Sequence, residues 1–152
     1  MIEYLAARPE FIPALAEKLL AHWGPIIPGQ TLEGRVAKLR GHLNRDVLPI
    51  AWVALEGDAL IGTAALRAHD LEGREDLTPW LGGVFVLEEH RKQGIGALLC
   101  ERVEAEARAL GYNQIYLFAT DRVAWYRSLG WDLVERITWN GFPGAIMRRS
   151  LG

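Results

Sequence analysis

One segment, residues 80–111, constrains this chain more than any other: WLGGVFVLEEHRKQGIGALLCERVEAEARALG. Its apolar start predicts a strand, and the helix formers after Gly96 predict a helix that ends at Gly111. Helices usually begin with a Ser, Thr, Asp or Asn cap, whereas this one begins with Gly94 and Gly96. Uncovered N–H groups at a helix start attract anions, so the pattern predicts a phosphate site. The alternative is that the glycines only permit a tight turn.

The rest of the chain alternates strand and helix patterns without a linker or repeat. This pattern predicts one α/β (α+β) domain over residues 1–152, in which a helical N-terminal third is followed along the chain by the strands of a mixed sheet. Thr31 is expected to cap a helix, and Asp121 to cap a short helix over 122–128 that Gly130 closes. The predicted inner face of the first of these helices is Leu32, Val36, Leu39 and Leu43. Strands are predicted over 2–6, 47–55, 59–68, 80–87, 113–120, 131–139 and 145–151, and a further helix over 9–23. The EGD stretch at 56–58 predicts a hairpin that joins the second and third of these strands.

Composition narrows the classes of partner. The chain has 17 Lys and Arg residues against 19 Asp and Glu, so attraction to nucleic acid or an acidic membrane is not expected. No apolar run approaches the roughly 20 residues of a membrane span, and no signal-peptide pattern is recognised. The single Cys100, predicted to be buried, fits a reducing compartment, and the four histidines lack metal-ligand spacing. We therefore expect a cytoplasmic protein without a metal site.

Two motifs resemble the GCN5-related N-acetyltransferases (GNAT). The run VFVLEEHRKQGIGALL is similar to that family's acetyl-CoA signature, Q/R-x-x-G-x-G/A, with Arg91, Gly94 and Gly96 at the fixed positions. The run IYLFATDRVAWYRSLGW resembles a later family motif, with Tyr126 on a short helix before the Gly130–Trp131 pair. The resemblance implies the GNAT fold, a mostly antiparallel mixed sheet of six to seven strands flanked by about four helices. It also implies an acyltransferase that uses acetyl-CoA as co-substrate.

The resemblance also implies where acetyl-CoA binds. The backbone N–H groups of Gln93, Gly94, Ile95, Gly96 and Ala97 would hold the pyrophosphate, beside the signature residue Arg91. The pantetheine arm would lie along the preceding strand and contact the main chain at Phe85 and Val86. The Gly82–Gly83 pair in that strand predicts a bulge or a close approach by another group, and the resemblance implies a bulge at the thioester.

The implied reaction is attack of an amine on the thioester, and the predicted catalytic residues are Tyr126 and Asp70. A tyrosine near pKa 10 is a weaker acid than a thiol near 8.5, so full proton transfer is uphill by about 2 kcal/mol. Instead of transferring its proton, Tyr126 could donate a hydrogen bond to the leaving sulfur. Alternatively, Tyr126 has no catalytic role and only packs a short helix. Strand 80–87 has no ionisable residue, so the base is sought in the loop before it, at the end of the preceding strand: Asp70, or His69 or Glu72. All three could instead be solvated.

Other functions remain open. A module of the same fold could bind acetyl-CoA as a sensor without turnover. A dinucleotide oxidoreductase is disfavoured, because GIGALL lacks the third glycine of that fingerprint. The acceptor amine is unknown, and the resemblance implies that segments 22–34, 69–79 and 139–144 select it. Acidic residues there (Glu72, Glu75 and Asp76) lie beside basic ones (Arg35, Arg67 and Arg74), so neither a cationic nor an anionic acceptor is excluded. Glu104 and Arg108 are predicted to pair on an exposed helix face. The protein is expected to be a monomer or a homodimer.

Overall fold

The computed structural model describes residues 1–25 and 27–152. Residue 26, within the predicted acceptor segment 22–34, lies outside the described residues. The strands are β1 (Ile2–Tyr4), β2 (Ile50–Glu56), β3 (Ala59–Arg67), β4 (Trp80–Val86), β5 (Gln114–Ala119), β6 (Asp132–Trp139) and β7 (Phe142–Ser150). The α-helices are α1 (Ile12–Trp23), α2 (Leu32–Arg40), α3 (Ile95–Ala109) and α4 (Val123–Ser128), with short 3-10 helices η1 (Leu5–Ala7), η2 (Pro9–Phe11) and η3 (Glu88–His90).

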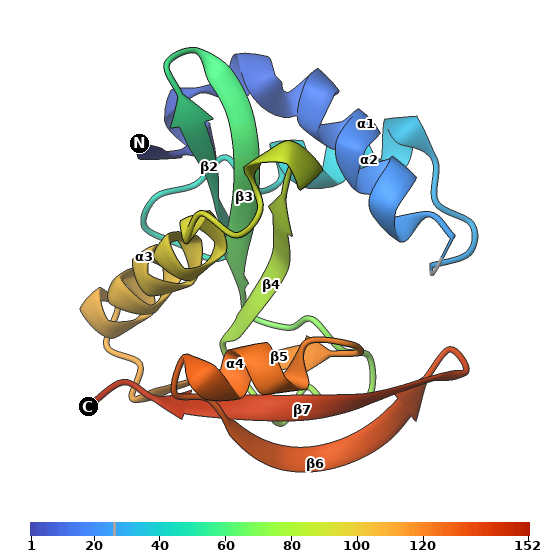
Figure 1. Cartoon of the computed structure of the whole chain (residues 1–152), viewed down its shortest axis with the longest axis vertical. Coiled ribbons are helices and arrows are strands. Elements are labelled where there is room, and N and C mark those ends of the chain that lie inside the picture. The colour runs from blue at the N-terminus through green and yellow to red at the C-terminus, as the bar shows by residue number, and fades with distance from the viewer. Residues whose placement is uncertain (26) are drawn as a thin grey trace.

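The described residues form a seven-stranded sheet in the order β1-β2-β3-β4-β5-β7-β6, and among them β4 and β5 are the one neighbouring pair that runs parallel (Figure 1). The mostly antiparallel mixed sheet and the four α-helices predicted from the resemblance are confirmed. The β2–β3 hairpin and the bulge of β4 are also as predicted. Ala65 pairs with Gly82 and Thr63 with Phe85, so Gly83 and Val84 oppose the single residue Ala64.

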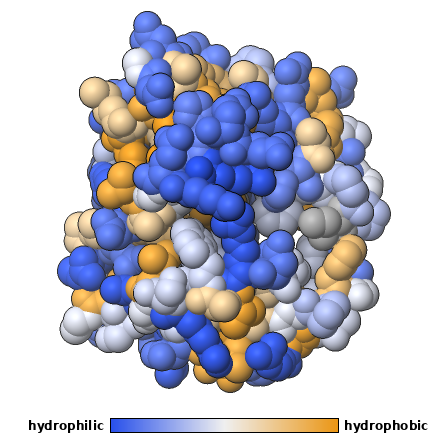
Figure 2. Space-filling view, in the orientation of Figure 1, coloured by the Kyte–Doolittle hydropathy of each residue, from blue (hydrophilic) through white to orange (hydrophobic). Residues whose placement is uncertain are grey.

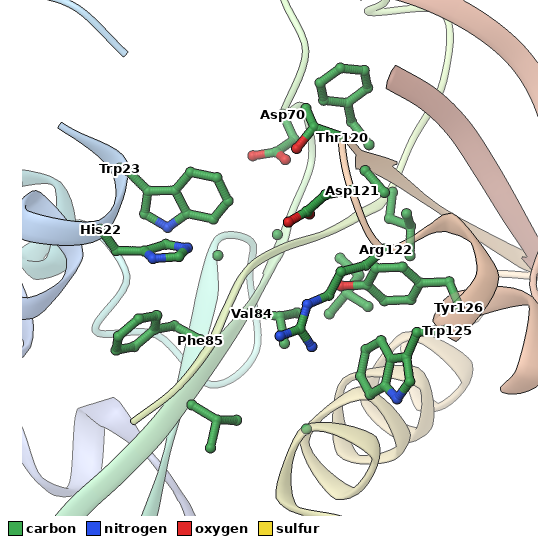
Figure 3. A pocket seen from close by; sticks show the side chains of 18 of the residues that line it. His22, Trp23, Asp70, Val84, Phe85, Thr120, Asp121, Arg122, Trp125 and Tyr126 are labelled. Atoms are coloured by element: carbon green, nitrogen blue, oxygen red, sulfur yellow. The ribbon is translucent and has the colours of Figure 1, made fainter. Parts of the chain in front are cut away.

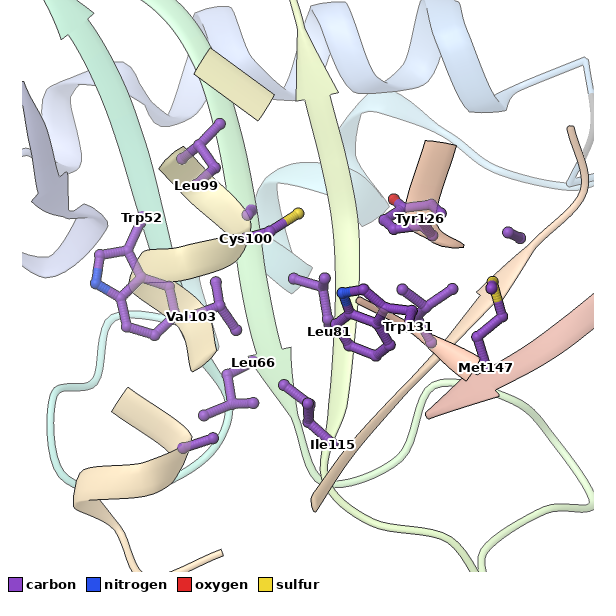
Figure 4. Packing of buried hydrophobic residues seen from close by; sticks show 14 of the residues in the cluster. Trp52, Leu66, Leu81, Leu99, Cys100, Val103, Ile115, Tyr126, Trp131 and Met147 are labelled. Carbon is purple, nitrogen blue, oxygen red and sulfur yellow. The ribbon is translucent and has the colours of Figure 1, made fainter. Parts of the chain in front are cut away.

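Helices cover both faces of the β1–β4 half of the sheet. Alternate residues of β2 point to opposite faces: Trp52 packs in the core under α3, and Val53 packs against α1 and α2. Figure 4 shows the first of these layers, with Cys100 and Val103 of α3 lying over the strands. Both Cys100 and Val103 are buried, as the sequence predicts for the cysteine. Within the described residues, no helix has the length and apolarity needed to cross a membrane.

Helix α2 differs from its predicted face. The Thr31 hydroxyl accepts a hydrogen bond from the Gly34 N–H at 3.0 Å, so the predicted cap is confirmed. Leu32, however, is exposed, and Arg35 and Leu39 are the buried residues of this helix. Arg35 comes four residues before Leu39 and therefore shares its face. An arginine thus lies on the inward face where the apolar pattern predicted only leucine and valine.

Three further predictions are wrong. Arg122, not Asp121, is the N-cap residue of α4, and it makes no side-chain capping bond. The last hairpin turns at Asn140–Gly141, and β7 already begins at Phe142. Glu104 is buried rather than solvated, and it pairs with Arg149 of β7 at 3.0 Å. Its predicted partner, the Arg108 side chain, instead donates to the Leu151 carbonyl.

Candidate active site

The parallel strands β4 and β5 separate beyond their first residues. Trp80 and Tyr116 form the ladder pair between them within the described residues. A cavity of about 710 Å³ opens where the strands part, bounded by the starts of α3 and α4, the end of α1 and the inward face of α2. Figure 3 shows His22, Trp23 and Phe85 on one side of it, with Trp125 and Tyr126 on the other. The sheet therefore supplies a cleft that ends at the mouth of α3.

The start of α3 has the properties of an anion site. Gly94 is the N-cap residue, with a left-handed φ of 81°, and no side chain caps the first turn. The first turn also contains no acidic residue. Figure 2 shows hydrophilic side chains over the segment that joins β4 to α3, where Arg91, Lys92 and Gln93 are exposed. The first N–H groups of α3 are thus left for a ligand, with basic residues beside them.

Gly96 has a packing role that the sequence pattern did not reveal. A Cβ at this position would lie 3.1 Å from the ring of Trp125, in α4. Gly96 therefore allows α4 to approach the start of α3 closely. The two glycines of the motif have different tasks: Gly94 provides the left-handed turn, and Gly96 provides space for the wall of the cleft.

The free edge of β4 lines the cleft beside this site. Val84, Phe85 and Val86 are cavity residues, and they lie past the point where β5 leaves β4. The Arg91 side chain donates to the Val86 carbonyl at 3.0 Å, so it joins the end of β4 to the mouth of α3. An extended ligand arm can add along this edge by main-chain hydrogen bonds.

Tyr126 lies in the wall of the cleft opposite Phe85 (Figure 3). Its side chain is buried between Trp125 and Trp131, whose rings it meets edge-on, and it also lines the cavity (Figure 3). Burial raises the pKa of the Tyr126 hydroxyl well above its usual value. The hydroxyl is therefore a stable hydrogen-bond donor at neutral pH and a weak source of a free proton.

Asp70 is the member of the three candidate bases that lines the cavity; His69 and Glu72 do not. Its Oδ1 accepts a hydrogen bond from Nη1 of Arg67 at 2.7 Å. The Arg67 guanidinium lies against the bulge of β4, because a Cβ on Gly82 would fall 2.7 Å from Nη1. The glycines of the bulge thus make room for an Arg67–Asp70 pair at the cleft wall.

A buried histidine supports this pair from behind. Arg67 Nε donates to His42 Nε2 at 3.0 Å, so the other ring nitrogen carries the proton and donates to the Lys38 carbonyl at 2.7 Å. Burial first, and then the Arg67 charge, lowers the pKa of His42 to about 4. A protonated ring would lose the Arg67 bond and face a cation.

His42 should make stability fall in mild acid. Its folded pKa lies below the unfolded value of 6.5, so its contribution is full above pH 6.5 and is lost progressively towards pH 4. Between pH 7 and pH 5 we expect this residue to cost about 2 kcal/mol of unfolding free energy. Urea unfolding of the wild type and of His42→Gln measures it. The variant, which can keep both hydrogen bonds, should show a smaller loss over this range; equal losses would contradict the prediction.

The cavity brings together most of the predicted site. Seven of the eight predicted cofactor residues line it: Phe85, Val86, Arg91, Gly94, Ile95, Gly96 and Ala97. Gln93 is exposed beside them and does not line the cavity. Both predicted catalytic residues, Tyr126 and Asp70, are cavity residues. Of the other lining residues, Trp23 falls in the predicted acceptor segment 22–34, and Arg35 and Arg67 lie beside the predicted acceptor segments. Lys38 was not predicted, and the inward position of Arg35 had a signal only in its spacing from Leu39 on α2.

Comparisons with known proteins fit this arrangement. A family described as acetyltransferase (GNAT) domain matches residues 49–133, more than half of the chain. Amino-acid acetyltransferase of Pseudomonas syringae pv. syringae is 31% identical over 97 residues, which are 64% of this chain and 21% of that protein. The Pseudomonas putida (strain GB-1) protein of the same name is 31% identical over 104 residues, 67% of this chain and 23% of its own length. The chain spans only about a fifth of these relatives.

Solved structures share the whole fold. Aminoglycoside 6'-N-acetyltransferase complexed with coenzyme A superposes with a TM-score of 0.77 at 20% identity, covering 100% of this chain and 97% of that chain. The Salmonella typhimurium protein yncA, solved with its cofactor acetyl-CoA, superposes with a TM-score of 0.75 at 17% identity, covering 100% and 94%. The family match and the shared fold agree with the motifs around Gly94 and Tyr126, and the chain belongs to the GNAT acetyltransferase family.

Proposed function

We propose that the chain transfers the acetyl group of acetyl-CoA to a primary amine of a small molecule or peptide. One observation carries this proposal: a single cavity contains the uncapped start of α3, the free edge of β4 and the Tyr126 side chain. These are the three features needed to hold a phosphate group, an extended arm and a leaving sulfur. The relatives named amino-acid acetyltransferase, and neighbours solved with coenzyme A or acetyl-CoA, support it.

The binding roles follow from the position of each group. The N–H groups from Gly94 to Ala97 would hold the pyrophosphate, with Arg91 beside them. The main chain of Phe85 and Val86 would hold the pantetheine arm at the edge of β4. Gln93 would contribute through its backbone N–H, since its side chain is exposed and the residue does not line the cavity.

Acetyl-CoA supplies an activated acetyl group: the amine nitrogen bonds to the acetyl carbon, the carbon–sulfur bond breaks and the amine loses a proton. N–H groups of the β4 edge would stabilise the negative charge that develops on the acetyl oxygen. Tyr126 would donate a hydrogen bond to the departing sulfur while water delivers the proton, because its raised pKa opposes full proton transfer. Asp70 retains lone pairs besides the one used by Arg67, so it would orient the amine and accept its proton.

Replacing Tyr126 with Phe tests this assignment. We expect a 10- to 100-fold loss of turnover, the value of one hydrogen bond to a developing thiolate, with acetyl-CoA affinity changed less than twofold. Release of the coenzyme A thiol measures turnover, and calorimetry measures affinity. Tyr116→Phe is the matched control, because Tyr116 is an equally buried tyrosine that does not line the cavity. Full turnover of Tyr126→Phe would remove Tyr126 from the mechanism.

The alternative function is a sensor that binds acetyl-CoA without turnover. It predicts tight acetyl-CoA binding by the wild type and no thiol release with any amine. The names of the relatives and neighbours leave the acceptor open, since amino acids are zwitterions and aminoglycosides are polycations. The charge of the cleft supports one of these two acceptor classes over the other.

A further inference from the structure

The far end of the cleft carries a group of positive charges. Arg35 and Lys38 of α2 and Arg67 at the end of β3 all line the cavity, opposite the α3 end. The carboxylate among them is Asp70, which Arg67 already holds at 2.7 Å. We call Arg35, Lys38 and Arg67 the α2 basic cluster. Because it has three cations and one neighbouring carboxylate, the cluster has an excess of positive charge.

Arg35 shows that this excess lacks a partner. Its side chain belongs to a residue that is 7% exposed, and its hydrogen-bond partner within the described chain is the neutral Gln30 Oε1 at 3.1 Å. Neither Arg35 nor Lys38 has a carboxylate within 4 Å among residues 1–25 and 27–152. A buried guanidinium without a counter-charge is costly, so its retention at a cavity wall indicates an anionic ligand.

The cations of this cluster repel one another. Burial and the charge of Arg67 lower the pKa of Arg35 from its usual value, and the same two causes lower that of Lys38 to about 8. The Lys38 side chain lines the cavity and is exposed to solvent there. The surrounding protein and the charges of Arg67 and Arg35 nevertheless disfavour its protonated form. An anion bound between Arg35 and Lys38 would relieve this repulsion.

We infer that the acceptor is an amine that carries an anionic group, a carboxylate or phosphate, a few bonds from its nitrogen. The inference rests on the proposed function, which places the acetyl group beside the bulge of β4. Arg67 touches that bulge, so an anion on the basic cluster lies close to the reacting nitrogen. Asp70 would then face the ammonium while Arg35 and Lys38 face the anion. A polycation such as an aminoglycoside would meet repulsion here.

Matched pairs of amines test the inference. Alanine and ethylamine, phenylalanine and phenethylamine, and phosphoethanolamine and ethanolamine differ mainly in the anionic group, and kanamycin serves as the polycation. Calorimetry on the coenzyme A-saturated protein measures binding without turnover, and thiol release with acetyl-CoA measures turnover. We expect the anionic member of at least one pair to bind about tenfold or more tightly than its partner. Equal binding within every pair, no binding, or preference for kanamycin would overturn the inference.

Variants of α2 locate the effect. Lys38→Glu should weaken binding of the anionic amine about tenfold or more, with acetyl-CoA affinity unchanged. Arg40→Glu is the control, since Arg40 is an exposed cation of the same helix that does not line the cavity. Equal loss in both variants, or loss of acetyl-CoA binding in Lys38→Glu, would overturn the inference. Anion-dependent binding without thiol release would instead refute the proposed transferase, and turnover of only the amines that lack an anionic group would refute only the acceptor class.

Discussion

Replacing Gly94 with Asp should weaken acetyl-CoA binding by about 100-fold or more. The added carboxylate would lie at the uncapped start of α3, where the proposed pyrophosphate site needs free N–H groups. It would also be free to cap those N–H groups itself, as Asp does at ordinary helix starts. Asp tolerates left-handed backbone better than most residues, and nothing lies within 4 Å of a Cβ here, so folding should survive.

Gly111→Asp is a closely matched control for this variant. Gly111 lies just after the other end of α3, has a φ of 94° and also has open space around a Cβ. The two variants therefore share the charge change and a similar backbone strain, and differ in which helix end they alter. Calorimetric titration with acetyl-CoA should show binding near one per chain for the wild type and Gly111→Asp. NAD should not bind. Undiminished binding by Gly94→Asp would refute the assigned cofactor site.

Replacing Arg149 with Met should destabilise the protein by about 3 kcal/mol at pH 7.5. Glu104 of α3 is buried, and Arg149 of β7 is its ion-pair partner at 3.0 Å. Removing one partner leaves a carboxylate in a poorly solvated place, which costs more than the pair itself contributes. The pair also ties α3, which carries the proposed cofactor site, to the β5-β7-β6 half of the sheet.

The pH dependence identifies the cause. Burial already raises the pKa of Glu104, and Arg149 opposes that shift, so the variant should raise it further. A folded pKa above the unfolded one means that the penalty is full at high pH and shrinks as pH falls through the folded pKa. Urea unfolding at pH 7.5 and pH 5 should show this decrease. Adding Glu104→Gln should restore much of the loss, and Arg148→Met, at an exposed neighbour, should cost under about 0.5 kcal/mol. A penalty that is independent of pH would contradict the explanation.

Local sequence determined the elements and the mouth of the site. The Thr31 cap, the β2–β3 hairpin, the bulge at Gly82–Gly83 and the turn at Gly94 each depend on residues within a few positions of one another. Backbone preferences, capping bonds and apolar periodicity act over that range, so the pattern contains them. The resemblance around Gly94 and Tyr126 then supplied the mixed, mostly antiparallel character of the sheet.

Only the tertiary structure decided which charges face the cleft. Arg35, Arg67 and Asp70 come from different elements, and their meeting depends on how α2, β3 and the following loop pack around the bulge. Burial of Glu104 depends likewise on Arg149, which lies 45 positions further along the chain. Electrostatic and packing energies depend on distance in space, and a separation of dozens of residues carries no record of that distance. The proposed cofactor end of this site is therefore readable from sequence, whereas the proposed acceptor end becomes visible only in the folded chain.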